Sequence, residues 1–487
     1  MKNMNASNAM KLTLCAGVLT MASLVSQGHA QSADALIDKL VEKGILTVNE
    51  ASDLRDQADK DFKTAFQAKT GMPDWVTGYK FSGDLRGRFE QYSSDNNLLI
   101  DQVRYRYRVR VGLTVNMMDN LEAGLRLTSA DAKGIGSQSS AGNPFSGNST
   151  LQDNFTKKGI YIDAAYGKWT PIGEGSWLLA ATVGKMDNPF QFTPMVFDPN
   201  LTPEGGALTG GYTINDKHSL AFAGGAFMMD AEGAFGLPPG SGGASSTHAP
   251  FMYGGQILWN AKWNDKWSST VGIGALAIVN PEELTTANVP AIHQGNTRTL
   301  QTIYYLSSPY YPAGSSTITA LVYNYTPLIA DASVTYTADS FPFYTGAFPI
   351  NFAGEFMNNP GAPKDNNAFW VGVTFGKSGT KKTWDLRYRY EYLEADAWYD
   401  QMVDDDNGAF YATSAYSSYT GSAGWYAGTN VKGHLVKLNY SFTDSLTFSV
   451  TCFLNDLIIP PTQNTSGYVV NLNSSAIHFM ADMMWKF

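Results

Sequence analysis

The stretch VRYRYRVRVGL, residues 103–113, decides the fold because arginine alternates with apolar residues along it. Arginine fills every second position from Arg104 to Arg110, and valine or tyrosine fills the positions between. A repeat of two residues is typical of a β-strand, whose successive side chains point to opposite faces. One face of this strand is therefore cationic and the other apolar, so we expect it to separate water or matching acids from a nonpolar medium.

The first thirty residues have the features of a secretory signal peptide. Lys2 and Lys11 precede the apolar run LTLCAGVLTMASLV, residues 12–25, and the small residues Gly28 and Ala30 follow it. The run is too short to span a bilayer as a helix. We therefore expect residues 1–30 to be removed, which leaves Cys452 as the only cysteine and excludes an intramolecular disulfide.

The charge balance argues against a nucleic-acid partner. The chain carries 34 lysines and arginines against 43 aspartates and glutamates, a formal net charge of −9. An acidic protein is a poor partner for a phosphate backbone, so the arginine row needs another explanation. The 26 tyrosines and 26 phenylalanines favour β structure.

Residues 31–74 have a helical pattern that the rest of the chain lacks. An apolar stripe from Leu36 to Val41 ends before Gly44, and the sequence TVNE at 47–50 is a capping box that opens a second helix. Such a helix pair cannot bury its apolar stripe alone. We therefore expect residues 31–74 to form a periplasmic segment that associates across subunits as a coiled coil.

From about residue 75 to residue 487 the pattern has a period of two, as in many short strands. Short and long connections alternate without a break, which is typical of an outer-membrane β-barrel with short periplasmic turns and long outer loops. There are two weak points: the sequence GIYIDAAYGKW at 159–169 fits neither face cleanly, and the strands near 329–338 and 346–358 lie in a poorly patterned region. The sixteen expected antiparallel strands lie near 79–91, 101–116, 120–130, 156–170, 176–187, 205–214, 218–230, 252–264, 267–279, 329–338, 346–358, 366–377, 382–396, 430–442, 445–456 and 474–487.

The cost of a charge in lipid decides which way the arginines point. One arginine at the bilayer midplane on the lipid face costs about 2–4 kcal/mol, so four would cost about 8–16 kcal/mol, which is close to the whole stability of a domain. The arginines therefore face the interior, as the lining of an aqueous pore or as an arginine–carboxylate lattice that props the barrel. The same alternation assigns these residues to the pore lining: Arg86, Arg88, Arg104, Arg106, Arg108, Arg110, Arg126, Arg387, Arg389, Asp84, Glu90, Glu122, Asp385 and Glu391.

The chain resembles the bacterial "putative porin" family, relatives of the phosphate-selective porins. The resemblance covers nearly all of the mature chain and implies a pore-forming barrel, a homotrimer and a periplasmic coiled-coil start. The loop at 188–204 departs from a dedicated phosphate channel, because it has no cluster of lysines. The resemblance rests on LVEKGILTVNEASDL (40–54), VGKMDNPF (183–190), GEFMNNPGAPKDNNAFWVGVTFG (354–376), WDLRYRYEYLEADAWYD (384–400), KGHLVKLNYSFTDSLTFSVT (432–451) and FMADMMWKF (479–487).

Two further segments carry expected roles. In sixteen-stranded porins the third outer loop folds inward, so by analogy we expect residues 188–204 to narrow the pore, with Asp198 and Glu204 opposite the arginines. The closing residues alternate apolar side chains up to Trp485 and Phe487, which resembles the terminal-strand signal read by the barrel-insertion machinery.

Other candidate sites are weak. The G-x-G-x-x-A spacing at 272–277 lies inside an expected strand, without the helix that a dinucleotide site needs. The histidines have no metal-ligand spacing, so we expect no metal and no cofactor. An acidic run at 396–406 is expected to be a solvated loop, with a divalent cation or cation-bridged lipopolysaccharide as the alternative.

The sequence therefore predicts an outer-membrane porin for the passive diffusion of small polar solutes and ions, with a mild preference for anions. Expected partners are lipid, lipopolysaccharide and small polar or anionic solutes. A structural or adhesive surface protein is the alternative function. An enzyme is not expected, because no nucleophile–base set can be recognised.

Overall fold

The computed structural model describes residues 51, 54, 73–94, 101–132, 141–230, 249–285, 293–305, 314–411, 424–459, 462–465, 468–471 and 473–487. The chain divides into two compact units, Met1–Thr77 and Gly78–Phe487. The expected signal peptide lies outside the described residues, and so does the expected helix pair except Ala51 and Leu54, which are helical. Within the described part of the chain, no helix is both long enough and apolar enough to cross a membrane.

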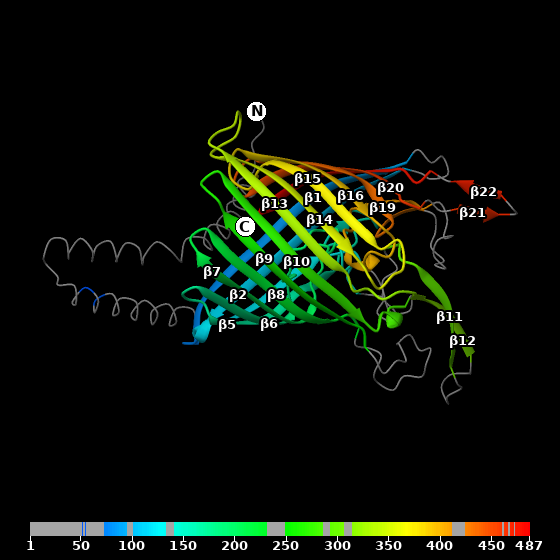
Figure 1. Ribbon diagram of the computed structural model, residues 1–487, viewed down its shortest axis with the longest axis horizontal. Helices are drawn as coiled ribbons and strands as arrows, with labels where there is room; N and C mark the ends of the chain where they lie inside the picture. The colour runs from blue at the N-terminus through cyan, green and yellow to red at the C-terminus, as the bar shows by residue number, and fades with distance from the viewer. Residues whose placement is uncertain are drawn as a thin grey trace, which may run out of the picture. The chain divides into compact units, whose positions relative to one another are not determined.

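Sixteen antiparallel strands form one closed barrel, as the sequence predicts (Figure 1). Each strand pairs with the next, and the last pairs with the first, so the sheet has no free edge. The strands are β1 (Val76–Ser93), β2 (Gln102–Met117), β3 (Leu121–Ser129), β5 (Ile160–Ile172), β6 (Trp177–Lys185), β7 (Glu204–Asn215), β8 (His218–Met228), β9 (Phe251–Lys262), β10 (Trp267–Val279), β13 (Leu328–Ala338), β14 (Phe348–Asn358), β15 (Asn367–Gly376), β16 (Thr383–Leu393), β19 (Val431–Ser441), β20 (Leu446–Leu457) and β23 (Ala476–Lys486).

Most connections alternate between short turns and long loops, although those on either side of β14 (339–347 and 359–366) are similar in length, and both ends of the barrel sheet lie on the short-turn side. The long loops carry β4 (Ser149–Thr150), which pairs with β2, and three hairpins: β11 (Arg298–Tyr305) with β12 (Gly314–Leu321), β17 (Gly408–Tyr411) with β18 (Gly424–Ala427), and β21 (Thr462–Thr465) with β22 (Tyr468–Asn471). Hairpins β11–β12 and β21–β22 extend beyond the barrel wall on the long-loop side (Figure 1).

The outer face of the barrel is apolar, because one side of each strand exposes large hydrophobic residues. Tryptophans Trp169, Trp177, Trp263, Trp267 and Trp485 are also exposed, each near a strand end beside a short turn or at the chain end. Indole prefers the membrane–water interface, so these rings mark one edge of a lipid-facing band. Other exposed members of the band include Val103, Tyr105, Leu125, Val183, Leu208, Ile257, Ile273, Val334, Phe352, Val371, Leu438, Leu454 and Ile477.

A β-bulge explains why β5 fits neither face in the sequence. Arg126 of β3 pairs with Ala164, but the next residue, Leu127, pairs with Ile162, so Asp163 is an extra residue. Ile162 before the bulge and Trp169 after it are both exposed, although their numbers differ in parity. The bulge therefore turns the Asp163 carboxylate inward while the apolar residues on both sides of it stay on the outer face.

Candidate functional site in the barrel interior

The arginine row of β2 faces the barrel interior. Val103 and Tyr105 expose 51% and 57% of their surfaces, whereas Arg106 and Arg108 expose only 7% and 5%. We call the inward charged faces of β1, β2, β3 and β16 the arginine wall. The fourteen residues predicted to line the pore all occupy inward positions of these four strands, alternating with the outward apolar residues: Arg86, Arg88, Arg104, Arg106, Arg108, Arg110, Arg126, Arg387, Arg389, Asp84, Glu90, Glu122, Asp385 and Glu391.

Within the wall, neighbouring strands β1 and β2 exchange ion pairs. Asp84 of β1 accepts from Arg108 at 2.7 Å with one carboxylate oxygen and from Arg110 at 2.7 Å with the other. Glu90 lies 2.9 Å from a guanidinium nitrogen of Arg104 and 3.5 Å from one of Arg106. Each carboxylate of β1 therefore holds two arginines of β2, which keeps the like charges of that row apart.

The sequence did not identify several partners of the wall arginines. Arg88 donates to both oxygens of Asp482 on β23, at 2.8 and 3.0 Å. Arg126 donates to the bulge residue Asp163 and to Asp187, which follows β6. Asp482 could have been predicted from the alternation of inward and outward residues along β23. Asp163 could not, because the β-bulge interrupts the alternation in β5.

Some side chains of the arginine wall are exposed to solvent, while others are buried in ion pairs. The side chains of Arg104, Arg110 and Arg126 are 28%, 27% and 26% exposed, and that of Arg387 is 52% exposed. The buried arginine–carboxylate pairs correspond to the lattice that the sequence left open as an alternative, and the exposed arginines sit beside it. Buried ion pairs and partly exposed arginines thus occur together in the arginine wall.

The loop between β6 and β7 folds into the barrel and binds inward side chains of β9, β14 and β15. The backbone N–H of Gln191 donates to Gln256 on β9 at 2.7 Å. The Thr193 hydroxyl donates to Glu355 on β14 and accepts from the indole N–H of Trp370 on β15 at 3.0 Å. These three strands contribute inward side chains, so the loop lies in the interior as the analogy with porins implies.

An apolar core inside the barrel holds this loop. The rings of Phe190 and Phe192 lie over Gly254 and Gly274, where a Cβ atom would come within 2.6 and 2.5 Å of a ring carbon. The two glycines therefore give the wall the hollow that the phenylalanines fill. The loop residues buried in this core are Met186, Phe190, Phe192, Met195, Val196 and Phe197.

A second loop, residues 394–411 after β16, also folds inward, which corrects the expectation of a solvated acidic loop. Asp400 forms a buried ion pair with Arg298 at 2.8 Å, and Asp396 accepts from the backbone N–H of Thr297 at 2.9 Å. Asp406 lies 3.1 Å from Arg88, and Asp404 lies 3.7 Å from Arg389. The acids look solvated in the sequence because their cationic and hydroxyl partners lie on distant segments.

The two inward loops hold each other. The Trp398 indole N–H donates to the carbonyl of Val196 at 2.8 Å, and the backbone N–H of Asp404 donates to the carbonyl of Pro194 at 3.0 Å. The backbone N–H of Asp198 donates to the carbonyl of Met402 at 2.7 Å. One loop is bound to β9, β14 and β15 and the other to β1, β16 and β23. Because β1 and β9 are the first and eighth of the sixteen barrel strands, the joined loops bridge the interior.

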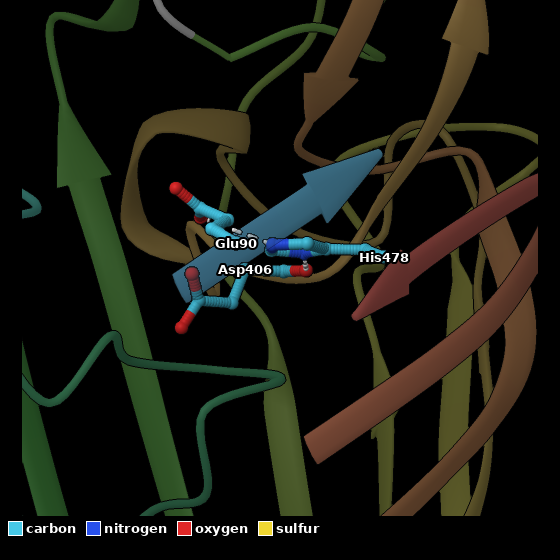
Figure 2. A group of neighbouring side chains, drawn as sticks. All are labelled: Glu90, Asp406 and His478. Carbon is cyan, nitrogen blue, oxygen red and sulfur yellow. Dashed lines mark hydrogen bonds and ion pairs between the residues drawn. The ribbon is translucent and has the colours of Figure 1, made fainter. Parts of the chain in front are cut away.

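The second loop is fastened to the wall by a small polar group (Figure 2). The His478 Nδ1–H of β23 donates to the backbone carbonyl of Asp406 at 2.8 Å, and Nε2 lies 3.0 Å from Glu90. His478 and Glu90 are both fully buried. Three potential metal ligands meet here, but Arg104 and Arg88 already bind the two carboxylates, so we assign no metal.

The two residues expected in the constriction have different positions. Asp198 is fully buried, and its carboxylate oxygens accept backbone N–H groups from Asn200 at 2.6 Å and Asp405 at 3.0 Å. Glu204 begins β7 on the same face as exposed Leu208 and pairs with Lys185 at 2.9 Å. Asp198 is thus part of the bridge, whereas Glu204 lies on the outer face because the strand starts there.

Burial and neighbouring charges shift the acids at the loop contact in opposite directions. Burial, and after it Asp404, raises the pKa of Asp198 to about 8. Burial and Asp406 raise the pKa of both Asp404 and Asp405. Burial alone would also raise the pKa of Asp406, but Arg88 and His478 outweigh it and hold this pKa below its ordinary value. Asp198, Asp404 and Asp405 come close together, yet we assign them no ion because backbone N–H groups take the Asp198 oxygens.

Comparison with known proteins finds one matching family model and several similar solved structures. Residues 91–302 match a family model described as "Putative porin". Among solved structures the chain is similar to OprB of Pseudomonas putida, at 12% identity and a TM-score of 0.46 over 84% of this chain and 94% of that one. It is also similar to OmpF of Salmonella typhi in complex with daunomycin, at 8% identity and a TM-score of 0.42 over 84% and 97% of the two chains. No curated protein sequence matches the chain.

Proposed function

We propose that the chain is a porin-type barrel of the outer membrane and that it passes small polar solutes and ions by passive diffusion, with a mild preference for anions. The observation that supports a channel most directly is the contrast between the two faces of one closed sheet. The outer face exposes apolar side chains, and the inner face carries arginines that are partly exposed. Barrels of sixteen to eighteen strands leave room for an aqueous channel.

A planar lipid bilayer tests the channel directly. Purified protein should add stepwise, ohmic increments of ion current to the membrane. A structural or adhesive surface protein, which the long outer loops would also suit, should add none. If correctly folded, heat-modifiable protein adds no ion current to the membrane, the result would therefore favour the structural function over the channel.

The anion preference is expected to be mild because most wall arginines are paired. Paired guanidinium groups contribute little net charge to the solute path, so the exposed ones matter most. The side chain of Arg387 is 52% exposed, more than those of Arg104, Arg110 and Arg126. It also forms an ion pair with Asp385 at 2.9 Å. Exposed charges act over about 10 Å in 0.1 M salt and about 3 Å in 1 M salt, so the preference should be clearest in dilute salt.

Changing Arg387 to glutamine should move the reversal potential toward cations in dilute salt, because one exposed positive charge leaves the interior. Assembly should be unaffected, since the side chain is not buried in the lattice. Arg387→Lys is the matched control, because it keeps the charge and should keep the selectivity. If Arg387→Gln has the selectivity of the unchanged protein at 0.1 M salt, this arginine does not face the solute path.

We further propose that residues 1–30 are a signal peptide and that residues 31–74 form a periplasmic coiled coil beneath a trimer. The apolar stripe of Leu36, Ile37, Leu40 and Val41 supports this, because a single helix pair cannot bury it.

Removing residues 31–70 should leave a folded barrel with a weaker oligomer. The measurement is the mobility of the truncated protein in mild detergent against that of the full mature chain. A truncated protein that keeps the same oligomer at all dilutions would show that the barrel walls alone hold the subunits together.

A further inference from the structure

Four hydrogen-bond donors lie side by side on the inner wall of four neighbouring strands (Figure 1). We call them the donor row: Thr374 of β15, Arg387 of β16, Lys437 of β19 and Thr451 of β20. Thr374 pairs with Arg387, Arg387 with Lys437, and Lys437 with Thr451. All four face inward, since the next residues along β16 and β19, Leu386 and Leu438, are exposed on the outer face. Paired strands lie about 4.8 Å apart, so adjacent members of the row can reach the same small ligand.

Two like charges stand directly opposite each other in this row. Arg387 and Lys437 are register partners on paired strands, and like charges in that position destabilise a sheet. The row itself contains no carboxylate to separate them. Within the part of the chain that the structure describes, the side chains of Thr374, Lys437 and Thr451 have no hydrogen-bond or ion-pair partner. A local rule broken in this way is expected at a functional site, where a ligand supplies what the fold leaves out.

The carboxylates around Lys437 are already bound to arginines. Those that it faces are Asp404, Asp406 and Asp482. Arg88 lies 2.8 Å from Asp482 and 3.1 Å from Asp406, and Arg389 lies 3.7 Å from Asp404. The positive charge of Lys437 is therefore left for an anion from solution.

Asp385 holds Arg387 in a position that keeps its outer nitrogens available. The Nε–H of Arg387 donates to Asp385 at 2.9 Å. The same carboxylate accepts from Asn439 at 2.8 Å and from the backbone N–H of Ser378 at 3.1 Å. Asp385 offsets one positive charge at most, so Arg387 and Lys437 together keep a net positive charge. The two terminal nitrogens of the exposed guanidinium form a fork that matches two oxygens of one anion.

We propose that the donor row is a binding subsite for one small oxyanion, either the carboxylate of an organic acid or a sulfate ion. The inference rests on the proposed function and deepens it, because it names a solute class for the same channel. The guanidinium fork of Arg387 takes two oxygens, while the ammonium of Lys437 and the two threonine hydroxyls donate to the same ion. A halide has a single acceptor atom and cannot bridge these donors in the same way.

The test is the ion current of the full mature protein in planar bilayers in 0.1 M KCl, where exposed charges act over about 10 Å. Potassium acetate, potassium sulfate or potassium bromide is added in the millimolar range. An oxyanion bound to the row should lower the chloride current with a saturating dependence on its concentration. Bromide should instead raise the current in proportion. Block by acetate alone assigns the row to carboxylates, block by sulfate alone to inorganic oxyanions, and block by both to either class; each of these results supports the subsite.

Three variants assign the block to named side chains. Lys437→Met relieves the like-charge pair, so it should assemble normally, and it should raise the half-blocking concentration about tenfold or more through the lost charge-assisted hydrogen bond. Thr374→Val removes a hydroxyl and no charge, so it should raise the half-blocking concentration several-fold and leave the reversal potential in KCl unchanged. The matched control is Lys168→Met, an inward lysine of β5 that stands opposite Glu122 and should keep the block.

The outcomes separate the subsite from the channel. A channel whose current neither acetate nor sulfate blocks overturns the subsite and leaves the channel intact. A block that survives unchanged in both Lys437→Met and Thr374→Val does the same, and Thr374→Val alone decides if Lys437→Met fails to assemble. Folded, heat-modifiable protein that carries no current in any of these salts overturns the proposed function itself.

Discussion

Deleting Phe487 should remove most of the folded barrel from the outer membrane and leave precursor in the periplasm. The reason is the seam between the first and last strands. The backbone N–H of Gly83 donates to the carbonyl of Phe487 at 2.8 Å, and the N–H of Phe487 donates back at 3.0 Å. The Phe487 ring lies 6.1 Å from that of Phe81 and also covers Gly83. The deletion removes this closing pair and the aromatic end expected to be read by the insertion machinery.

Heat-modifiable mobility of the membrane fraction measures this loss. Phe487→Tyr keeps both the ring and the backbone pair and should assemble as well as the unchanged chain. Phe487→Ala keeps the backbone bonds alone and should fall between Phe487→Tyr and the deletion. Normal amounts of heat-modifiable barrel in the deletion would refute the assignment of Phe487 as an assembly determinant.

Replacing Val109 by arginine should destabilise the barrel by about 2–4 kcal/mol, the cost of an arginine on the lipid face at the bilayer midplane. Val109 lies halfway along β2 on the outer face, between the inward residues Arg108 and Arg110. The variant therefore places a guanidinium group on the lipid-facing side of β2. Denaturant-dependent unfolding in lipid vesicles measures the cost, with Val109→Leu as the apolar control.

Depth in the membrane gives this prediction a second control. Val103 is also exposed on the outer face, but it is the second residue of β2 and lies at the long-loop end. The cost of arginine falls to about 0–1 kcal/mol near the interface. Val103→Arg should thus be tolerated. Equal losses at the two positions would mean that β2 does not span the bilayer as proposed.

The strands could be predicted from the sequence because each needs only local information. Alternation along VRYRYRVRVGL separates the two faces of β2, and the same rule placed all sixteen strands. The rule could not assign the two faces of β5, because the extra residue Asp163 reverses the alternation in the rest of that strand. A bulge depends on pairing with the neighbouring strand, which a single strand's pattern does not contain.

The interior was harder to predict because its contacts join distant segments. The acids at 396–406 resemble a solvated loop, yet Asp400 pairs with Arg298 and Asp406 with Arg88. Glu204 seemed to belong to the inward loop, but β7 begins at that residue and turns it outward beside Lys185. In both cases the sequence shows the charge, and only the fold shows its partner.

Arg88 also has a consequence for the order in which the barrel forms. Its partners Asp406 and Asp482 lie 318 and 394 positions later in the chain, and contacts of such long sequence separation form slowly. In the exported chain, before the barrel closes, Arg88 therefore remains hydrated until the second loop and the last strand reach β1. The four arginines of β2 outnumber the two acids of β1, so the net positive charge of these strands should oppose edge-to-edge pairing of unfinished sheets from different copies. We therefore expect the arginines that later face the interior to reduce aggregation of the exported chain while the barrel is still open.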